Sequence, residues 1–332
     1  MPVSPPTMRA ITQDGYGAPA RVLRLDEIPV PPIGADDVLI QMRATSVNTP
    51  DWATVTGVPY ILRLGFGLRR PRRVVRGSDI AGVVQAVGQA VTGLAPGDDV
   101  FGSTRTRAGA FAEYVVVPAA QLVKKPAGLA FTDAAASVTT GLAALIALRD
   151  VAQVTAGTRV LINGASGGVG TMAVQIARML GAEVTGVCGT GNAELVRSLG
   201  AHHVIDYTEE DFTQGRQRFD VILDNVLNHP PKATARVLAP QGVLLPNSIG
   251  YTGGVLAGLP RTARAVLMGF GSTTVRLVTP APNRENLTAL LGLLESGEVR
   301  TVVDQTYPLD QAAGAVTHML KHHASGKVAI TA

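Results

Sequence analysis

The sequence predicts a two-domain α/β protein in which a β-rich region is followed by a doubly wound parallel sheet. Its 332 residues suffice for about two domains of roughly 150 residues each. Up to about residue 126 the apolar runs are short and end at turns such as Pro96-Gly97-Asp98, as is typical of strands. From about residue 132, helix-length segments alternate with buried strands, which indicates βαβ units. We therefore expect a domain boundary near residue 127.

The predicted elements follow this division along the chain. In the first region we expect strands at 38–40, 80–87 and 111–117. In the second, strand 159–163 leads through a glycine-rich turn into helix 168–180. The same alternation continues to the end of the chain. It predicts helices at 194–199, 231–238, 284–296 and 309–322, and strands at 183–187, 204–207, 219–224, 242–246, 299–304 and 327–331.

The composition is that of a packed globular enzyme. Hydrophobic residues make up 46% and charged residues 16% of the chain, which excludes a disordered protein. A single cysteine, Cys188, excludes a disulfide scaffold and a four-cysteine zinc site. The net charge of +4 gives no reason to expect nucleic-acid binding. Residues 1–7 lack the pattern of a signal peptide, so we expect a cytoplasmic protein.

Two segments of unusual composition have ordinary interpretations. The longest uncharged segment, 237–260, contains repeated Pro and Gly residues, so we expect strand and loop there rather than a membrane span. Residues 63–76 are rich in arginine, which we interpret as a solvated basic loop, with an anion-binding or membrane-surface patch as the alternative. These arginines are Arg63, Arg69, Arg70, Arg72, Arg73 and Arg76.

The strongest chemical signal is the segment from Val160 to Gly170, in which an apolar strand runs into a glycine-rich turn and a helix. Glycines there allow backbone N–H groups to approach a pyrophosphate at the helix N-terminus, and Gly170 permits close packing of helix and strand. Since Ala165 replaces the first glycine of the G-x-G-x-x-G spacing, the interpretation depends on the strand–turn–helix context. The residues expected to bind a dinucleotide are Ala165, Ser166, Gly167, Gly168, Val169 and Gly170.

The end of the second strand, Val187 to Asn192, lacks the carboxylate that binds the ribose 2′-hydroxyl of NAD. A 2′-phosphate would meet no repulsion at this point, so NADPH is favoured over NADH, which stays the alternative. We expect Cys188 to be a small buried residue beside the cofactor rather than a reactive thiol. The residues expected near the phosphate are Cys188, Thr190, Asn192 and Tyr207, with Arg197 as an alternative to Tyr207.

Several segments together resemble the medium-chain dehydrogenase/reductase superfamily, in its zinc-independent quinone oxidoreductase-like branch, over nearly the whole chain. The resemblance implies a GroES-like β-barrel catalytic domain of residues 1–127 and 284–332 and a Rossmann domain of residues 128–283. It also implies an active cleft between them and a homodimer formed through a last Rossmann strand near 275–278. The segments are 47–52, 77–84, 96–102, 109–114, 165–170, 307–309 and 326–328.

The same resemblance bears on zinc. Where the zinc-dependent branch has a cysteine, a His-Glu pair and a second cysteine, this chain has Asn48, Ser78-Asp79 and Ala136. These side chains do not supply the soft or imidazole ligands that zinc needs, so we expect no zinc and a structural role for Asp79. His318 and His322 are interpreted as surface histidines, with a shared metal ion as the alternative.

Without a Lewis acid, hydrogen-bond donors must polarise the substrate, which suits hydride addition to a quinone or to the β-carbon of an enone. Asn48 is the candidate donor to the developing enolate oxygen. Tyr60 is the candidate proton donor, since related enoyl-thioester reductases carry a tyrosine near this position, and a tyrosine packed at the cleft rim is the alternative. We expect Asp51 and Trp52 at the substrate pocket, with Asp51 ordering the loop and Trp52 lining the pocket.

The remaining cofactor contacts are implied by the resemblance. Thr140 lies in the helix expected to face the nicotinamide, and Asn225 and Lys327 complete the predicted cofactor-binding residues. The chain departs from the family at Ala143, Gly191 and Leu227, where a threonine, an arginine and a glycine are common. We therefore keep two alternatives to the reductase of a small-molecule quinone or enone. One is a biosynthetic tailoring enzyme, for enoyl reduction or a redox-neutral step, and the other is a non-catalytic nucleotide-binding protein.

Overall fold

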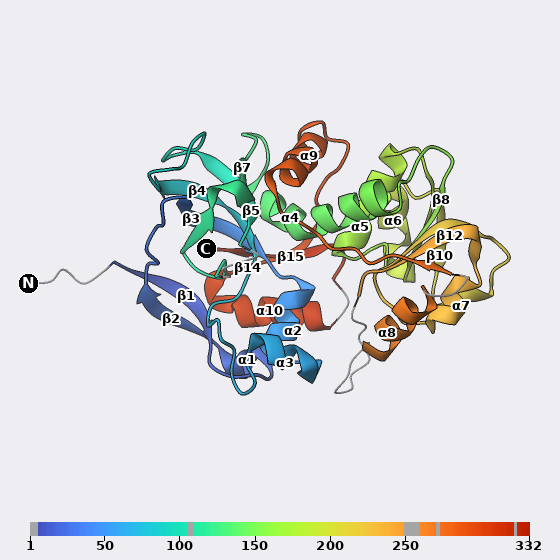
Figure 1. The fold of residues 1–332 in the computed structure, drawn as a ribbon, viewed down its shortest axis with the longest axis horizontal. Helices are drawn as coiled ribbons and strands as arrows, with labels where there is room; N and C mark the ends of the chain where they lie inside the picture. Colours follow the sequence, from blue (N-terminus) through green and yellow to red (C-terminus); the bar gives the residue numbers. More distant parts are fainter. Residues whose placement is uncertain (1–5, 105–108, 249–258, 270–272, 322–323) are drawn as a thin grey trace, which may run out of the picture. The chain divides into compact units, whose positions relative to one another are not determined.

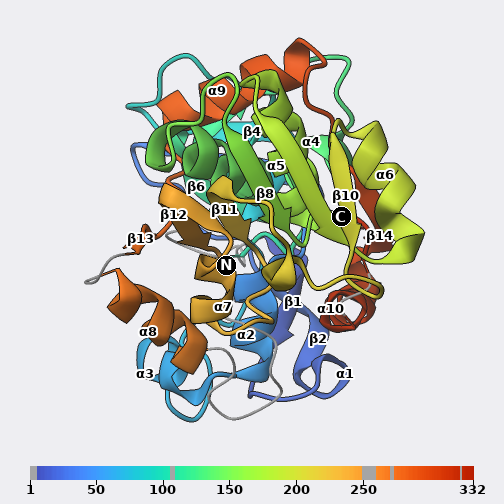
Figure 2. The same cartoon turned by 90° about the vertical axis from the view of Figure 1, so that its right-hand side faces the viewer.

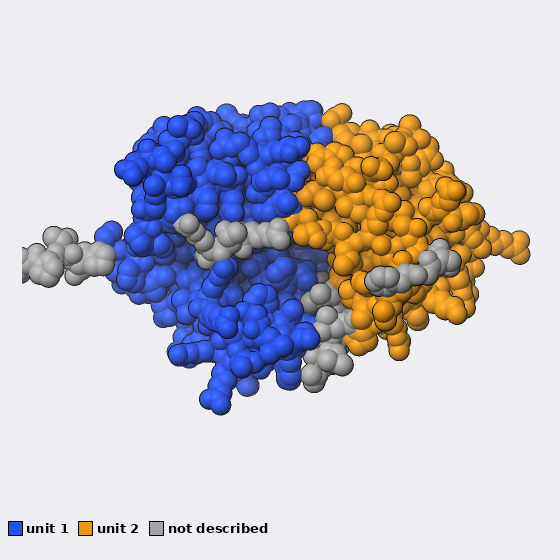
Figure 3. Space-filling view, in the orientation of Figure 1, with its two compact units in different colours: residues 1–139, 281–297, 301–332 blue, residues 140–280, 298–300 orange. Residues whose placement is uncertain are grey.

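The computed structural model describes residues 6–104, 109–248, 259–269, 273–321 and 324–332. The chain divides into two compact units, coloured separately in Figure 3. The first unit comprises residues 1–139, 281–297 and 301–332, and the second comprises residues 140–280 and 298–300. The division falls after Thr139, later than the predicted boundary at 127, because helix α4 (Phe131–Leu145) is continuous and its first turns belong to the first unit.

Among the described residues of the first unit, seven strands form one sheet and two more form a separate hairpin (Figure 1). The central strand β3 pairs antiparallel with β4, β6 and β15, so the C-terminal strand completes a sheet begun near the N-terminus. The strands are β1 (Thr7–Gln13), β2 (Leu23–Pro29), β3 (Asp37–Ser46), β4 (Asp79–Val87), β5 (Asp99–Ser103), β6 (Tyr114–Pro118), β7 (Leu122–Lys124), β14 (Val303–Pro308) and β15 (Lys327–Thr331).

The period-2 pattern of these strands explains the core of the first unit. Val38, Ile40 and Met42 alternate along β3 and are all buried against Ile80 and Val84 of β4. Short helices cover the strand ends. They are α1 (Pro19–Val22), α2 (Thr49–Thr56), α3 (Arg63–Phe66), α9 (Arg284–Glu295) and α10 (Ala312–Leu320).

The second unit contains a parallel sheet with strand order β10-β9-β8-β11-β12-β13. Figure 2 labels β12, β11, β8 and β10 of this sheet, and β9 lies between β8 and β10. The order reverses between β8 and β11, and open α/β sheets bind nucleotides at such a switch point. The elements are β8 (Arg159–Asn163), α5 (Gly168–Met179), β9 (Glu183–Cys188), α6 (Ala193–Ser198), β10 (His203–Asp206), β11 (Phe219–Asp224), α7 (Pro231–Ala235), β12 (Leu238–Pro246), α8 (Leu259–Met268) and β13 (Thr274–Val275).

The fold predicted from the sequence is confirmed in class, with a GroES-like sheet and a Rossmann-type parallel sheet. The strand predicted at 111–117 begins only at Tyr114, and the helix predicted at 231–238 ends at Ala235. Two further differences are larger. The strand expected at 299–304 is β14, Val303–Pro308, because Tyr307 and Pro308 pair with β15 while Val299 is buried outside any strand. In segment 237–260, β12 is followed by residues 249–258, which lie outside the described residues, and helix α8 begins at Leu259.

One helical segment, Phe131–Val151, is long and apolar enough by composition to cross a membrane. Its most apolar window is 78% buried inside the protein. It is therefore packed as a core helix of this fold.

Candidate active site

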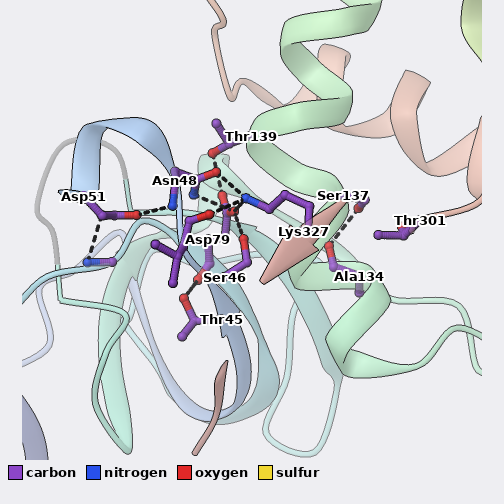
Figure 4. Close-up of polar contacts among 12 residues, drawn as sticks. Thr45, Ser46, Asn48, Asp51, Asp79, Ala134, Ser137, Thr139, Thr301 and Lys327 are labelled. Carbon is purple, nitrogen blue, oxygen red and sulfur yellow. Dashed lines mark hydrogen bonds and ion pairs between the residues drawn. The ribbon is translucent and has the colours of Figure 1, made fainter. Parts of the chain in front are cut away.

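The first unit carries a buried polar centre where three paired strands meet (Figure 4). Asn48 follows the end of β3 and is the N-cap of α2, Asp79 opens β4, and Lys327 opens β15. All three side chains are at most 4% exposed. Residues far apart in the sequence thus come together because β4 and β15 both pair with β3.

The Asp79 carboxylate accepts hydrogen bonds on both oxygens. Its Oδ2 accepts from Ser46 Oγ at 2.5 Å and Asn48 Nδ2 at 2.8 Å, and its Oδ1 accepts from Thr139 Oγ1 at 2.6 Å. Lys327 Nζ lies 3.9 Å from Oδ2. A buried charge needs such compensation, so this geometry agrees with a structural carboxylate.

Lys327, which was predicted to bind the cofactor, directs its ammonium group to oxygens of the first unit. Its Nζ donates to Asn48 Oδ1 at 2.6 Å and to the Val47 carbonyl at 2.7 Å. Burial lowers the pKa of Lys327, and Asp79 and Asp51 oppose this shift. Ser46 was absent from the predicted site, because a hydroxyl side chain carries no sequence signal that distinguishes this role.

Asp51 lies at the third position of α2 and connects two backbone segments of the centre. Its Oδ2 accepts from the backbone N–H of Asn48 at 2.8 Å, and its Oδ1 accepts from the backbone N–H of Gly77 at 3.3 Å. Burial raises the pKa of Asp51 to about 6 from an ordinary value of 3.8, although the Asn48 N–H acts in the opposite direction. The Asp51 carboxylate therefore holds the backbone at Asn48 and Gly77 in place, although its burial disfavours the charged form.

This shift predicts a pH dependence of stability. Because the folded state binds the Asp51 proton more tightly than the unfolded state, the Asp51 contribution is fully present below pH 3.8 and is lost as the pH rises to about 6. The shift corresponds to about 3 kcal/mol. We expect the stability of Asp51→Asn relative to the wild type to improve by up to about that amount across this range. Urea unfolding of both proteins at several pH values measures it, and a constant difference would contradict the assignment.

The other two predicted residues of this region differ in exposure. Trp52, in α2, is only 5% exposed, whereas Tyr60 is 49% exposed. The guanidinium carbon of Arg63 lies 4.3 Å from the Tyr60 ring centroid and 4.5 Å from that of Tyr16. Gly57 has φ +67°, and a Cβ there would lie 2.6 Å from Arg63 Nε, so glycine allows this stacking. The role of Tyr60 as an acid stays a prediction.

The interpretation of residues 63–76 as a solvated loop is wrong for Arg76. Arg69, Arg70, Arg72 and Arg73 are exposed, but Arg76 is only 7% exposed. Its backbone carbonyl accepts from Phe111 N at 2.9 Å, which fixes this segment against the sheet. The clustering of arginines in the sequence could not distinguish the buried Arg76 from the exposed arginines before it.

The glycine-rich turn of the second unit has the geometry of a nucleotide site. Gly167 is the N-cap of α5 and makes no side-chain cap, and the first backbone bond into the helix is from Thr171 N to Gly167 O at 2.8 Å. The N–H groups of the first turn, at 168–170, are therefore directed out of the helix, as an anion requires. A Cβ at Gly170 would lie 2.0 Å from Gly164 O, so only glycine allows this turn to pack on the helix.

A network of amide and carboxylate groups supports this turn from β8 and β11. Asn163 Nδ2 donates to Asp224 Oδ1 at 2.8 Å, and Asn225 Nδ2 donates to the Asn163 carbonyl at 3.2 Å. Burial raises the pKa of Asp224. Leu227 has φ +54°, a left-handed conformation in which glycine is unstrained, and its N–H donates to Asp224 Oδ1 at 2.8 Å. This backbone conformation explains why glycine is common at this position in the family.

The end of β10, which lies beside the end of β9, carries a carboxylate that was not among the predicted site residues. Cys188 is 1% exposed and pairs with Asp206 at the end of β10. The Thr190 hydroxyl and the N–H and hydroxyl of Thr208 hold the pKa of Asp206 below its ordinary value. Tyr207, 60% exposed, lies against Gly189, where an added Cβ would be 3.0 Å from its hydroxyl oxygen. The sequence does contain this acidic residue, but it ends β10 rather than β9, where the cofactor-binding carboxylate was expected.

Asp206 leads to a prediction about nucleotide preference. Because its carboxylate is ionised beside Cys188, it should repel a 2′-phosphate at the end of β9. We expect Asp206→Asn to raise the affinity for NADPH relative to NADH by about threefold to tenfold. Fluorescence titration of wild type and variant with both nucleotides measures this ratio. An unchanged ratio would show that the 2′-phosphate lies elsewhere.

The histidine pair of the C-terminal helix was the second candidate metal site. His318 Nε2 lies 2.7 Å from Asp304 Oδ2, and its Nδ1 lies 3.1 Å from the Tyr307 hydroxyl. His322 lies outside the described residues. Within the described ranges, no group of three or more His, Cys, Asp or Glu residues is placed to share a metal ion.

A GroES-like sheet with a buried polar centre and a Rossmann-type sheet with an open helix N-terminus define the class of nucleotide-dependent oxidoreductases. Two family models match the chain: "Alcohol dehydrogenase GroES-like domain" over residues 34–127 and "Zinc-binding dehydrogenase" over residues 199–330. The chain belongs to the medium-chain dehydrogenase/reductase superfamily, in its quinone oxidoreductase-like branch, and is an oxidoreductase.

Relatives of known name cover nearly the whole chain. A chloroplast envelope quinone oxidoreductase homolog from Arabidopsis thaliana is 31% identical, and the match covers 97% of this chain and 98% of that protein. A 2-methylene-furan-3-one reductase from Solanum lycopersicum is 33% identical, with coverages of 98% and 79%. The structure of the Escherichia coli quinone oxidoreductase complexed with NADPH has a TM-score of 0.82 at 25% identity, with coverages of 98% and 100%. That of the Coxiella burnetii quinone oxidoreductase has a TM-score of 0.86 at 27% identity, with the same coverages.

Proposed function

We propose that this protein is a zinc-independent, NADPH-dependent reductase that transfers hydride to a quinone or an α,β-unsaturated carbonyl compound, with NADH as the alternative nucleotide that the Asp206 carboxylate beside Cys188 would favour. The observation that carries the proposal is the buried centre in which Asn48, Asp79 and Lys327 bind one another. The names of the relatives support the two acceptor classes, one being a quinone oxidoreductase homolog and the other a reductase of a methylene-furanone.

Zinc, which one of the family descriptions names, does not fit this centre. The side chains at the expected ligand positions are Asn48, Asp79 and Ala136, none of which is a thiolate or an imidazole. Both Asp79 oxygens are occupied by hydrogen-bond donors, and the Lys327 ammonium lies 3.9 Å from one of them. A divalent cation would meet a positive charge here, so we derive no step through a metal ion.

A nicotinamide dinucleotide does fit the second unit. The open N–H groups at 168–170 would bind its pyrophosphate, and the space that Gly170 leaves beside Gly164 permits the tight turn this requires. Thr140, Asn225 and the residues around Cys188 and Thr190 stay predicted contacts. The reduced nicotinamide supplies a hydride when it is bound.

In the proposed reaction, a hydride bonds to the β-carbon of the acceptor, the electron pair of the C=C bond forms the enolate double bond to the carbonyl carbon, and the π electron pair of the C=O bond moves to the oxygen. The Asn48 amide donates a hydrogen bond to that oxygen and stabilises the enolate. A proton from Tyr60 or from water then completes the product at the α-carbon. For a quinone, the same hydride addition and one proton give the hydroquinone. We also propose a cytoplasmic homodimer that acts on a small molecule.

The test is a fluorescence titration of purified protein with NADPH and NADH, followed by 1,4-benzoquinone, 9,10-phenanthrenequinone and a medium-chain enone. NADPH oxidation with a quinone or the enone supports the proposal and identifies the acceptor class. Nucleotide binding without turnover of any acceptor would favour a biosynthetic tailoring enzyme or a binding role. Failure of both nucleotides to bind would overturn the proposal.

A further inference from the structure

The buried ammonium group of Lys327 contacts the Asn48 side chain in addition to the carboxylate that balances its charge. Its Nζ is buried and lies 2.6 Å from Asn48 Oδ1, 2.7 Å from the Val47 carbonyl oxygen and 3.9 Å from Asp79 Oδ2. An ammonium group has three N–H donors and no acceptor, so two donors are used on these carbonyl oxygens while the carboxylate balances the charge. The ammonium group therefore faces the Asn48 side chain.

These contacts fix which way the Asn48 amide points. Its oxygen accepts from Lys327, and its Nδ2 donates one hydrogen to Asp79 Oδ2 at 2.8 Å. The reversed amide would place an NH2 group against the ammonium and an oxygen against the carboxylate, both of which are repulsive. The second Nδ2 hydrogen has no partner among the described residues. Asn48 is thereby left with one oriented N–H.

The ammonium also changes the strength of that donor. A charged donor on the amide oxygen draws electron density from the amide, which makes the remaining N–H a stronger donor in a buried environment. In the zinc-dependent branch of the superfamily a metal ion polarises the substrate oxygen directly. Here the positive charge is the Lys327 ammonium, which would act on the substrate oxygen through the Asn48 amide between them.

We propose that Lys327 is a positioning residue for the reaction: it orients and polarises the Asn48 amide, and its ammonium replaces a metal ion as the cation of this centre. The inference rests on the proposed function, because it assumes that Asn48 binds the carbonyl oxygen of the acceptor. In this role Lys327 transfers no proton, and binding of the nucleotide does not depend on it. This role differs from that of a cofactor-binding lysine in ways that kinetics distinguish.

The kinetic test compares Lys327→Met with the matched surface variant Lys124→Met. The side chain of Lys124 is 58% exposed, and its ammonium pairs with Asp98. We expect Lys327→Met to lower kcat by about tenfold to a hundredfold, as for loss of part of an oxyanion donor, with the Kd for NADPH unchanged. Lys124→Met should leave both unchanged. A raised Kd for NADPH with normal kcat at saturation would overturn the proposal in favour of cofactor binding.

A second pair of measurements separates this inference from folding and from the proposed function. Lys327→Met alone leaves the buried Asp79 carboxylate without its positive partner. The double variant Lys327→Met with Asp79→Asn removes this negative charge, so it should fold while its kcat stays low. In protein labelled with 15N-asparagine, Lys327→Met should shift the Asn48 side-chain amide signals and leave those of Asn225 in place. Unshifted Asn48 signals would overturn the inference even if the wild type reduces acceptors, whereas absent turnover with shifted signals would overturn the proposed function and leave only the orientation of the Asn48 amide by Lys327.

Discussion

Replacing Gly170 by alanine should weaken NADPH binding by about tenfold or more and lower the free energy of unfolding by about 1–3 kcal/mol. The added Cβ would lie 2.0 Å from Gly164 O and 2.7 Å from the backbone of Ala165, so the turn before α5 must move away from the helix. The same turn presents the N–H groups that would bind the pyrophosphate. Urea unfolding and fluorescence titration with NADPH measure the two effects.

Two further alanine variants serve as controls. Gly292 lies within helix α9 with nothing within 4 Å of an added Cβ, so Gly292→Ala should leave binding unchanged and stabilise the helix by up to about 1 kcal/mol. At Gly167 the nearest atom to an added Cβ is 3.5 Å away, so Gly167→Ala should fold normally and report only on the approach of the phosphate. Equal NADPH affinities of Gly170→Ala and the wild type would contradict the assignment of this turn.

Asp79→Ala should lower the free energy of unfolding by about 3–5 kcal/mol, because it leaves the buried Lys327 ammonium without its carboxylate. It also removes the acceptor of Ser46, Asn48 and Thr139, three buried or half-buried donors. Urea unfolding at neutral pH measures the loss.

The matched control for this variant is Asp150→Ala. Asp150 is paired with Arg149 at 2.6 Å, but its side chain is 43% exposed, so its loss should cost only about 0–1 kcal/mol. If the Asp79 and Asp150 variants lose the same small amount of unfolding free energy, the buried centre of Asn48, Asp79 and Lys327 is not a stabilising ion-pair network.

The sequence predicted those features that depend on neighbours along the chain. The strand, turn and helix from Arg159 to Met179 are consecutive, so apolar periodicity and glycine positions were sufficient to predict this strand–turn–helix unit. Cys188 was correctly expected to be buried, since it ends a central strand. The fold class followed from the same local patterns.

Contacts between distant segments were beyond this kind of prediction. Asn48 and Lys327 are 279 positions apart, and their contact depends on the pairing of β15 with β3. Asp206 was missed because only the second strand was searched for a carboxylate, whereas parallel register brings the end of β10 beside Cys188. Arg76 was grouped with exposed arginines, although it is buried and its backbone carbonyl accepts a hydrogen bond from Phe111 in the loop before β6.

The central claim is that an amide, and not a metal ion, activates the acceptor carbonyl. The most direct measurement is kcat of chelator-treated, zinc-free wild type and of Asn48→Ala, with one acceptor at saturating NADPH. We expect full activity of the zinc-free wild type and a loss of about a hundredfold to a thousandfold in the variant, with unchanged Kd for NADPH. Activity that disappears with the chelator and returns with zinc, or a variant as active as the wild type, would contradict the claim.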